Sequence, residues 1–105
     1  MILKTATLLD LIQNALENVK AQNIVLCETK GKSSLFDAMI IASGTSSRQV
    51  AALARRAQED VKNAGVDILG VEDSSGWVLV DFGNVLLHVM SPDTRAYYNL
   101  EELWA

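Results

Sequence analysis

The sequence predicts an α/β fold in which helices flank a mixed five-stranded sheet. Two segments, about residues 7–20 and 46–64, carry apolar residues at helical spacing. Residues 36–43 are almost continuously apolar, a pattern typical of a central strand that is buried on both faces. Two further apolar runs, 77–82 and 85–90, are separated by a Gly-Asn pair and predict a β-hairpin.

The length and composition predict a single domain over residues 1–105. A chain of this size buries roughly two thirds of the surface that it exposes when unfolded, which is enough for one core. Hydrophobic residues make up 50% of the chain and charged residues 21%, as in ordinary globular proteins.

The first helix is expected over residues 7–20. Thr7 is its predicted N-cap, because Asp10 follows three residues later as in a capping box. The apolar residues at helical spacing are Leu8, Ile12, Ala15, Leu16 and Val19.

A short run with β propensity, residues 24–28, precedes the central strand. Since the connection between them is short, we expect the two strands to be antiparallel neighbours. The connection contains Lys30, Gly31, Lys32, Ser33 and Ser34. We interpret it as a solvated turn, because two lysines are too few to bind nucleic acid on their own.

The second helix is expected to begin after Ser46, which forms a capping box with Gln49, and to end at Gly65 as C-cap. Its apolar stripe consists of Val50, Leu53, Ala54, Ala57, Val61 and Ala64. Because alanine is frequent in this stripe, the helix should lie close against the sheet.

A strand over residues 66–71 follows and would complete a βαβ unit with the central strand, so we expect the two strands to be parallel and the crossover right-handed. In the hairpin, Gly83 and Asn84 supply the positive φ angles that a two-residue turn needs. Pro92 stops the last strand, and one helical turn is expected over residues 93–98. The tail should then pack back through Leu100, Leu103 and Trp104.

Composition also restricts the compartment and the partners. The single cysteine, Cys27, cannot form an internal disulfide, and we expect it to be a buried small apolar residue in a reducing cytoplasm. The sequence contains no signal peptide pattern and no apolar run long enough for a membrane span. The net charge of −4, from 9 basic and 13 acidic residues, predicts little direct RNA contact, because RNA affinity depends largely on Lys and Arg.

The turn from Gly44 to Arg48 is a candidate anion site, because it connects a buried strand to a helix N-terminus. A nucleotidyltransferase would also need paired carboxylates for magnesium, and no Asp-x-Asp or Glu-x-Glu occurs in the sequence. We therefore interpret this turn as helix capping and expect no metal or cofactor. A nucleotide-binding or nucleotidyltransferase-like enzyme that uses this turn is the alternative.

His88 is the only histidine, and no nucleophile, base and orienting group can be assembled around it. We expect a hydrogen-bonded or interface histidine, with Asp81 across the hairpin as a candidate partner for the imidazole. No catalytic residue is predicted elsewhere.

The aromatic residues are concentrated near the carboxyl end, where Trp77, Tyr97 and Tyr98 lie. Adjacent tyrosines on a helical turn cannot both face inward, so at least one should be at the surface. Trp, Tyr and Arg dominate interface energetics, which favours a contact surface here. Arg95 could pair with Asp81 or Glu101 and hold the tail.

The same region resembles a known family. The pattern Trp77-x-x-x-Asp81-x-Gly83, a strand that carries His88, and Arg95-x-Tyr-Tyr-x-Leu-Glu-x-Leu-Trp are similar to the ribosomal silencing factor family, also called Iojap. Upstream, Lys32-Ser33-Ser34 and a strand that begins near Asp37 and leads into Ser43-Gly44-Thr45-Ser46-Ser47-Arg48 match as well. The resemblance extends from about residue 8 to residue 104. The loop before Trp77 departs from the family's usual Glu-Gly pattern.

The resemblance implies a fold similar to the nucleotidyltransferase core, and it implies a function. Members of the family bind the large ribosomal subunit through its protein uL14, block joining with the small subunit by steric exclusion, and lower translation when nutrients run short. If the protein acts on the ribosome, it should contact a ribosomal protein, many of which are basic, and its acidic groups would help to steer association. Carried over to this sequence, the expected partner-binding residues are Trp77, Asp81, His88, Arg95, Tyr97 and Tyr98. Leu79 or Leu87 would add apolar area, depending on which sheet face is open. In a third reading, the aromatic surface is buried against a second copy of the chain in a homodimer.

Overall fold

The computed structural model describes residues 4–29 and 35–104. The predicted turn over residues 30–34 and the predicted packing of the Leu103 and Trp104 side chains lie outside what it describes. Within the described residues, no helix is both long and apolar enough to cross a membrane.

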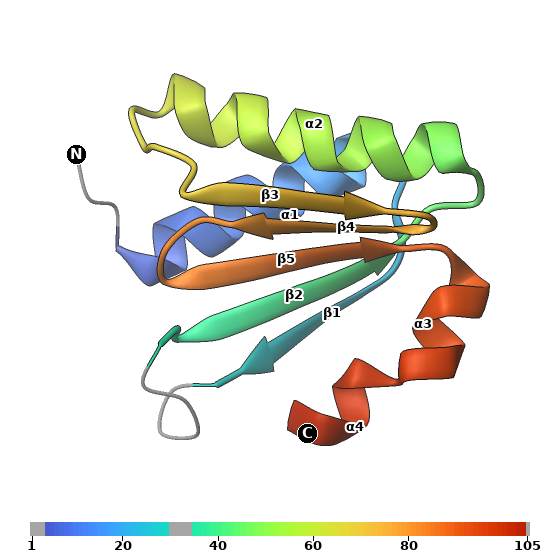
Figure 1. Cartoon of the computed structure of the whole chain (residues 1–105). Helices are drawn as coiled ribbons and strands as arrows, with labels where there is room; N and C mark the ends of the chain where they lie inside the picture. The colour runs from blue at the N-terminus through green and yellow to red at the C-terminus, as the bar shows by residue number, and fades with distance from the viewer. Residues whose placement is uncertain (1–3, 30–34, 105) are drawn as a thin grey trace.

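The fold is built on a mixed five-stranded sheet, as predicted (Figure 1). The strands are β1 (Gln22–Glu28), β2 (Ala38–Ser43), β3 (Gly70–Ser74), β4 (Trp77–Asp81) and β5 (Val85–Met90), in the spatial order β1-β2-β5-β4-β3. Neighbouring strands are antiparallel except β2 and β5, which are parallel. Every residue of β2 is buried, in agreement with its apolar sequence.

The prediction for the third strand was wrong in its bounds. Residues 66–69 form a connection in which Val66 and Ile68 pack against the core, and the strand itself is β3, at the sheet edge. It runs in the same direction as β2, as expected, but β5 and β4 lie between the two. All five residues of β3 are exposed, so the apolar pattern that normally marks a strand is missing from it.

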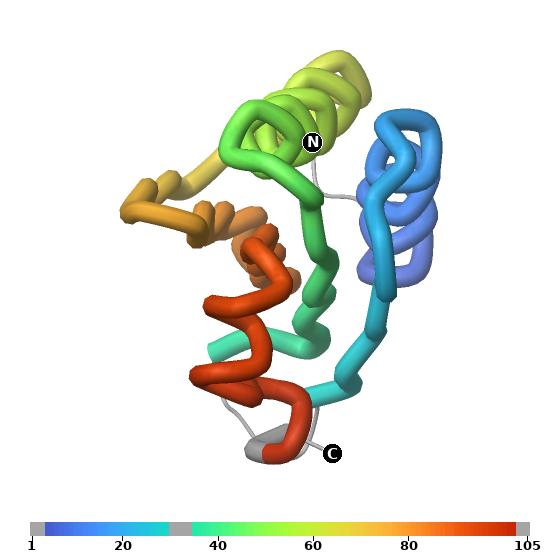
Figure 2. The backbone as a smooth tube through the Cα atoms, turned by 90° about the vertical axis from the view of Figure 1, so that its right-hand side faces the viewer, coloured from blue at the N-terminus to red at the C-terminus, as the bar shows by residue number. Residues whose placement is uncertain are grey.

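Two long helices, α1 (Thr5–Asn18) and α2 (Ser47–Asn63), cover one face of the sheet (Figure 2). Their buried apolar residues form the main core with the residues of β2, β4 and β5 that point to the same face. The core residues of β4 and β5 and of the turn between them are Val78, Val80, Phe82, Val85, Leu87 and Val89.

Both helices end in the same way, but only one of the two ends was visible in the sequence. Beyond α2, Gly65 has a φ of 88°, and the amide of Val66 donates to the carbonyl oxygen of Val61. Beyond α1, Lys20 has a φ of 64°, and the amide of Ala21 donates to the carbonyl oxygen of Leu16. This bonding pattern is the Schellman motif. At α1 it could not be predicted from the sequence, because Lys20 takes the position at which glycine is usual.

The start of α1 also differs from the prediction. The helix begins at Thr5, with Lys4 as N-cap and no side-chain capping bond, so Thr7 lies inside the first turn. At α2 the prediction was correct, because the Ser46 hydroxyl accepts the Gln49 amide at 3.1 Å.

The hairpin between β4 and β5 is confirmed, with one correction. Only Gly83 has a positive φ, of 96°, whereas Asn84 does not. One glycine at the first turn position is typical of a type II′ turn, in which the second position needs no positive φ.

Two short helices, α3 (Pro92–Tyr98) and α4 (Leu100–Trp104), lie on the opposite side of the sheet from α1 and α2 (Figure 2). Leu100 packs on a small apolar cluster on the β1 and β2 side of the sheet. The buried members of this cluster are Cys27, Met39, Ile41 and Met90. The short helices therefore cover only part of this face.

Candidate functional site

The part of the second face that the helices leave uncovered lies over β3, β4 and the start of β5. Strand alternation and register place six side chains there, beside Gly70. These residues, which we call the open half-face, are Glu72, Ser74, Trp77, Leu79, Asp81 and Leu86. Leu87 points the other way and is fully buried in the main core, so of the two leucines considered, Leu79 is the one on the uncovered side.

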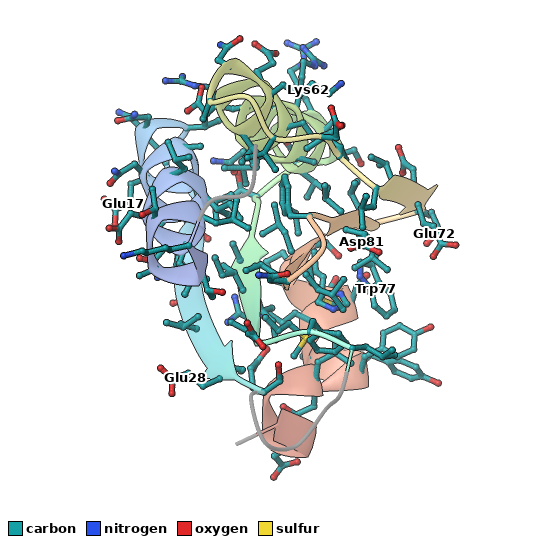
Figure 3. All side chains as sticks on the ribbon, turned by 90° about the vertical axis from the view of Figure 1, so that its left-hand side faces the viewer. Glu17, Glu28, Lys62, Glu72, Trp77 and Asp81 are labelled. Carbon is teal, nitrogen blue, oxygen red and sulfur yellow. The ribbon has the colours of Figure 1, made fainter. Side chains whose placement is uncertain are left out.

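Figure 3 shows three members of this set together. Glu72, Trp77 and Asp81 lie on the side of the sheet away from Glu17, which is on α1. The open half-face is therefore separated from the α1 side of the molecule by the sheet itself.

The aromatic residues form a connected group at one end of the open half-face. The rings of Trp77 and Tyr98 are 4.8 Å apart between centroids, and Tyr97 meets Tyr98 edge to face at 5.0 Å. Tyr97 is 81% exposed and Tyr98 is 50% exposed, whereas Trp77 is partly buried. Both tyrosines thus lie at the surface, beyond the one that the sequence required.

Two adjoining grooves extend along the open half-face from this aromatic group. One, of about 570 Å³, is lined by Glu72, Asp73, Ser74, Trp77 and Leu79. The other, of about 420 Å³, is lined by Gly70, Val71, Glu72, Leu79, Asp81 and Leu86. Glu72 and Leu79 line both grooves, so the two are neighbours on this face, and we refer to them together as the depression.

The rim of this depression is acidic. Glu72, Asp73 and Asp81 form no salt bridge within the described part of the chain. Asp81 has one backbone partner, since its Oδ1 accepts the Gly83 amide at 2.8 Å. Uncompensated carboxylates beside exposed rings and leucine side chains are a surface suited to a basic protein.

His88 lies beneath the surface, with only 7% of its area exposed. Its Nδ1 accepts a hydrogen bond from the Trp77 indole Nε1 at 3.0 Å. Burial lowers the pKa of the imidazole from 6.5 to about 4. The prediction that Asp81 is the partner of His88 was wrong. Asp81 lies opposite Leu86, and its carboxylate accepts the amide of Gly83 in the turn instead. His88 therefore lies beneath the Trp77 ring and contributes little to the exposed surface.

Arg95 is also buried, at 9% exposure, and its guanidinium group is engaged inside the molecule. Its Nε donates to Glu101 at 2.9 Å, and its Nη1 donates to the Ser43 hydroxyl at 3.0 Å. Of the two carboxylates considered for it, Glu101 is the partner. Arg95 thereby connects α3 to α4 and to the end of β2, and its buried guanidinium group is directed away from the surface.

The turn from Gly44 to Arg48 is occupied by its own side chains. Gln49 Oε1 accepts both the Thr45 amide and the Thr45 hydroxyl, and the Ser46 hydroxyl accepts the Gln49 amide. A Cβ at Gly44 would lie 2.9 Å from the Val50 amide nitrogen, so the glycine allows close packing of strand and helix. Among the described residues, no group of three or more potential metal ligands occurs.

The sequence analysis did not identify Glu72 and Leu86 as members of the open half-face, or Asp73 at the edge of its groove. Leu86 could have been found, since it alternates with His88 on one strand face. Glu72 and Asp73 gave no such signal, because they were assigned to a loop and their strand carries no apolar alternation.

A family model described as "Ribosomal silencing factor during starvation" matches residues 3–105. The chain belongs to the ribosomal silencing factor family. A Chromobacterium violaceum relative named "Ribosomal silencing factor RsfS" is 51% identical over 92 residues, which are 86% of this chain and 75% of the relative. A crystal structure of a protein from the same organism matches with a TM-score of 0.94 and 46% identity, over 97% of this chain and 87% of that one.

A more distant relative of this chain comes from Mus musculus. It is named "Mitochondrial assembly of ribosomal large subunit protein 1" and is 30% identical over 101 residues. These residues are 91% of this chain but 44% of the mouse protein.

Proposed function

We propose that this ribosomal silencing factor binds the large ribosomal subunit through its protein uL14 and thereby blocks joining with the small subunit. The family assignment supports a role on the ribosome. The name of the mouse relative refers to the large subunit in particular. In this proposal the protein acts in the cytoplasm, where it lowers translation during nutrient shortage.

The observation that carries the proposal is the open half-face. A sheet face is normally covered by another layer, because its apolar residues must be removed from water. Here α3 and α4 cover only part of the face, and Leu79, Leu86 and the Trp77 ring remain on the uncovered part. A partner protein would supply the missing layer.

The charge of the surface favours protein over RNA as the direct partner. The chain has a net charge of −4, and the rim of the depression carries Glu72, Asp73 and Asp81. RNA phosphates would be repelled from this rim, whereas lysine and arginine side chains of a ribosomal protein would be attracted. We therefore expect little direct RNA contact from this face.

Steric exclusion accounts for the effect without chemistry. The molecule measures 35 × 29 × 21 Å along its principal axes. A rigid body of this size on the face of the large subunit that meets the small subunit would hold the two apart. No catalytic residue is needed, and we propose none.

The direct test is sedimentation of the purified protein with large subunits, with small subunits and with both. We expect it to move with the large subunit and to reduce the amount of joined ribosome. Failure to move with the large subunit would refute the proposal. Light scattering of the free protein tests whether two copies pair before binding.

Removal of the Trp77 ring should weaken this binding. In Trp77→Ala, the largest aromatic anchor of the open half-face is lost, which at interfaces costs about 2 kcal/mol or more, or roughly 30-fold in affinity. Glu17→Ala is the matched control, because Glu17 is exposed on α1, across the sheet from Trp77 (Figure 3). If both variants are folded and bind the large subunit equally well, the open half-face is not the contact surface.

A further inference from the structure

We infer that His88 is a positioning residue for the partner surface, because its imidazole fixes the Trp77 indole in the orientation that the partner meets. The partner side of this inference rests on the proposed function. Its structural side concerns the free protein and is tested separately below.

The two residues are arranged diagonally across β4 and β5. Trp77 lies opposite Met90, and His88 lies opposite Leu79, so the indole must reach along the sheet face to meet the imidazole. Diagonal neighbours on one face are within reach of aromatic side chains. The indole Nε1 lies 3.0 Å from His88 Nδ1, and the ring centroids are 5.7 Å apart. The bond therefore sets the direction of the indole ring.

The protonation of the imidazole follows from the bond. An indole N–H can only donate, so His88 Nδ1 must be without a proton, and a neutral ring carries its proton on Nε2. Ile41 on β2 and Leu79 on β4 lie beside His88 in the sheet, and the side chain is 7% exposed. Burial favours the neutral imidazole by lowering its pKa to about 4. The acceptor is therefore available to Trp77 at neutral pH.

Tyr98 holds the indole on a second side, with its ring 4.8 Å from the Trp77 ring between centroids. Trp77 is thus held by the sheet interior through His88 and by α3 through Tyr98. A side chain that is ordered before binding loses little conformational entropy when the partner arrives. The imidazole would therefore contribute to binding without being on the surface.

Two substitutions separate positioning from simple filling of space. His88→Leu replaces the imidazole by an apolar group of similar size and removes the hydrogen-bond acceptor. His88→Asn places an amide oxygen at the distance from the backbone at which Nδ1 lies, so the indole N–H can still donate. A histidine that only fills the core would be replaced better by leucine than by asparagine, which is the opposite of our expectation.

The first measurement uses the free protein labelled with ¹⁵N-tryptophan, with Trp104→Phe to assign the two indole signals. In His88→Leu we expect the Trp77 indole proton to shift upfield and to exchange faster with water. In His88→Asn we expect a signal close to that of the unsubstituted protein. An unchanged Trp77 signal in folded His88→Leu would overturn the inference, whatever the result with ribosomes.

The second measurement is affinity for the large subunit. We expect His88→Leu to bind roughly three- to tenfold more weakly, the cost of ordering one freed side chain, and His88→Asn to bind nearly normally. In a Trp77→Phe background, which has no indole N–H, His88→Leu should cause no further loss. An equal loss in both backgrounds would show that His88 does not act through Trp77. If the unsubstituted protein does not bind, the proposed function fails, while the spectra still decide the geometry.

Discussion

At the scale of single residues, a buried histidine has a second consequence that is independent of any partner. The neutral imidazole of His88 has a pKa of about 4 in the folded protein, against 6.5 for an ordinary histidine. Between these values the unfolded chain binds more protons than the folded chain, so the free energy of unfolding rises with pH across this window. Acid therefore favours unfolding through this one side chain.

This linkage predicts a loss of stability between pH 6.5 and pH 4. The contribution of His88 should amount to about 3 kcal/mol over the window, at 1.36 kcal/mol per unit of pKa shift. Urea unfolding at pH 7 and at pH 4.5 measures it, with His88→Asn as the reference that has no titrating ring. As the pH falls, the unsubstituted protein should lose more stability than His88→Asn, and parallel curves would contradict the assigned burial of a neutral imidazole.

At the scale of elements, α3 and α4 depend on one buried guanidinium. Arg95 donates to Glu101 on α4 and to Ser43 at the end of β2. A buried charged group that loses its partners, or leaves them unpaired, is costly. Arg95 therefore holds α3, which carries Tyr97 and Tyr98, against the sheet.

Removal of this contact should be visible as lost stability. We expect Arg95→Ala to lower the free energy of unfolding by about 2 kcal/mol, the usual scale for hydrogen bonds to charged groups. Arg56→Ala is the control, since Arg56 pairs with Asp60 on the partly exposed surface of α2, and such pairs contribute about 0.5 kcal/mol or less. Equal losses in urea unfolding would show that burial of Arg95 has no special importance.

A second link joins the two long helices. Gln49 near the start of α2 donates through Nε2 to the carbonyl oxygens of Val19 and Lys20 at the end of α1, while its Oε1 accepts from Thr45. Gln49→Ala should therefore cost about 1 to 3 kcal/mol, because several polar groups lose their partner together. Gln58→Ala is the matched control, since that amide binds only Ala54 within its own helix. Thermal unfolding of the two variants makes the comparison, and similar midpoints would refute the link.

An element can be predicted from the sequence where its own residues show a clear pattern of apolar positions. β2, α2 and the β4–β5 hairpin are correct because their apolar spacing and caps are complete. The bounds of β3 were predicted wrongly because Val71, Glu72 and Asp73 lie on an exposed edge of the sheet, where alternation of apolar and polar residues is not required. The position of β5 between β2 and β4 depends on contacts between distant segments, and no local pattern encodes them.

The site shows the same division. Trp77, Tyr97 and Tyr98 were predicted to form an aromatic surface because they are concentrated near the carboxyl end of the sequence. The structure places their rings in one group. The Arg95–Glu101 pair was predicted because the two residues are close in sequence. The bonds from Trp77 to His88 and from Arg95 to Ser43 were not, because partners 11 and 52 positions away are known only once the fold is known.

At the scale of the whole molecule, an acidic surface should change the rate of association more than the lifetime of the complex. We expect Glu72→Lys to slow binding to the large subunit severalfold at low salt, with a smaller difference at high salt, because salt screens long-range attraction. Glu17→Lys is the matched control, since it changes the net charge equally on α1. Stopped-flow kinetics at several salt concentrations test this, and equal slowing by both variants would mean that only total charge matters.

The exposed edge of the sheet formed by β3 affects whether the protein aggregates at high concentration. β3 is the last strand, and its far side is not paired with another strand of the described chain. Unpaired strands of this kind can recruit further strands into aggregates, and charged side chains are a common protection. Glu72 and Asp73 would bring like charges together if two such borders met. The carboxylates that attract a basic partner would therefore also keep the molecules from stacking into fibres.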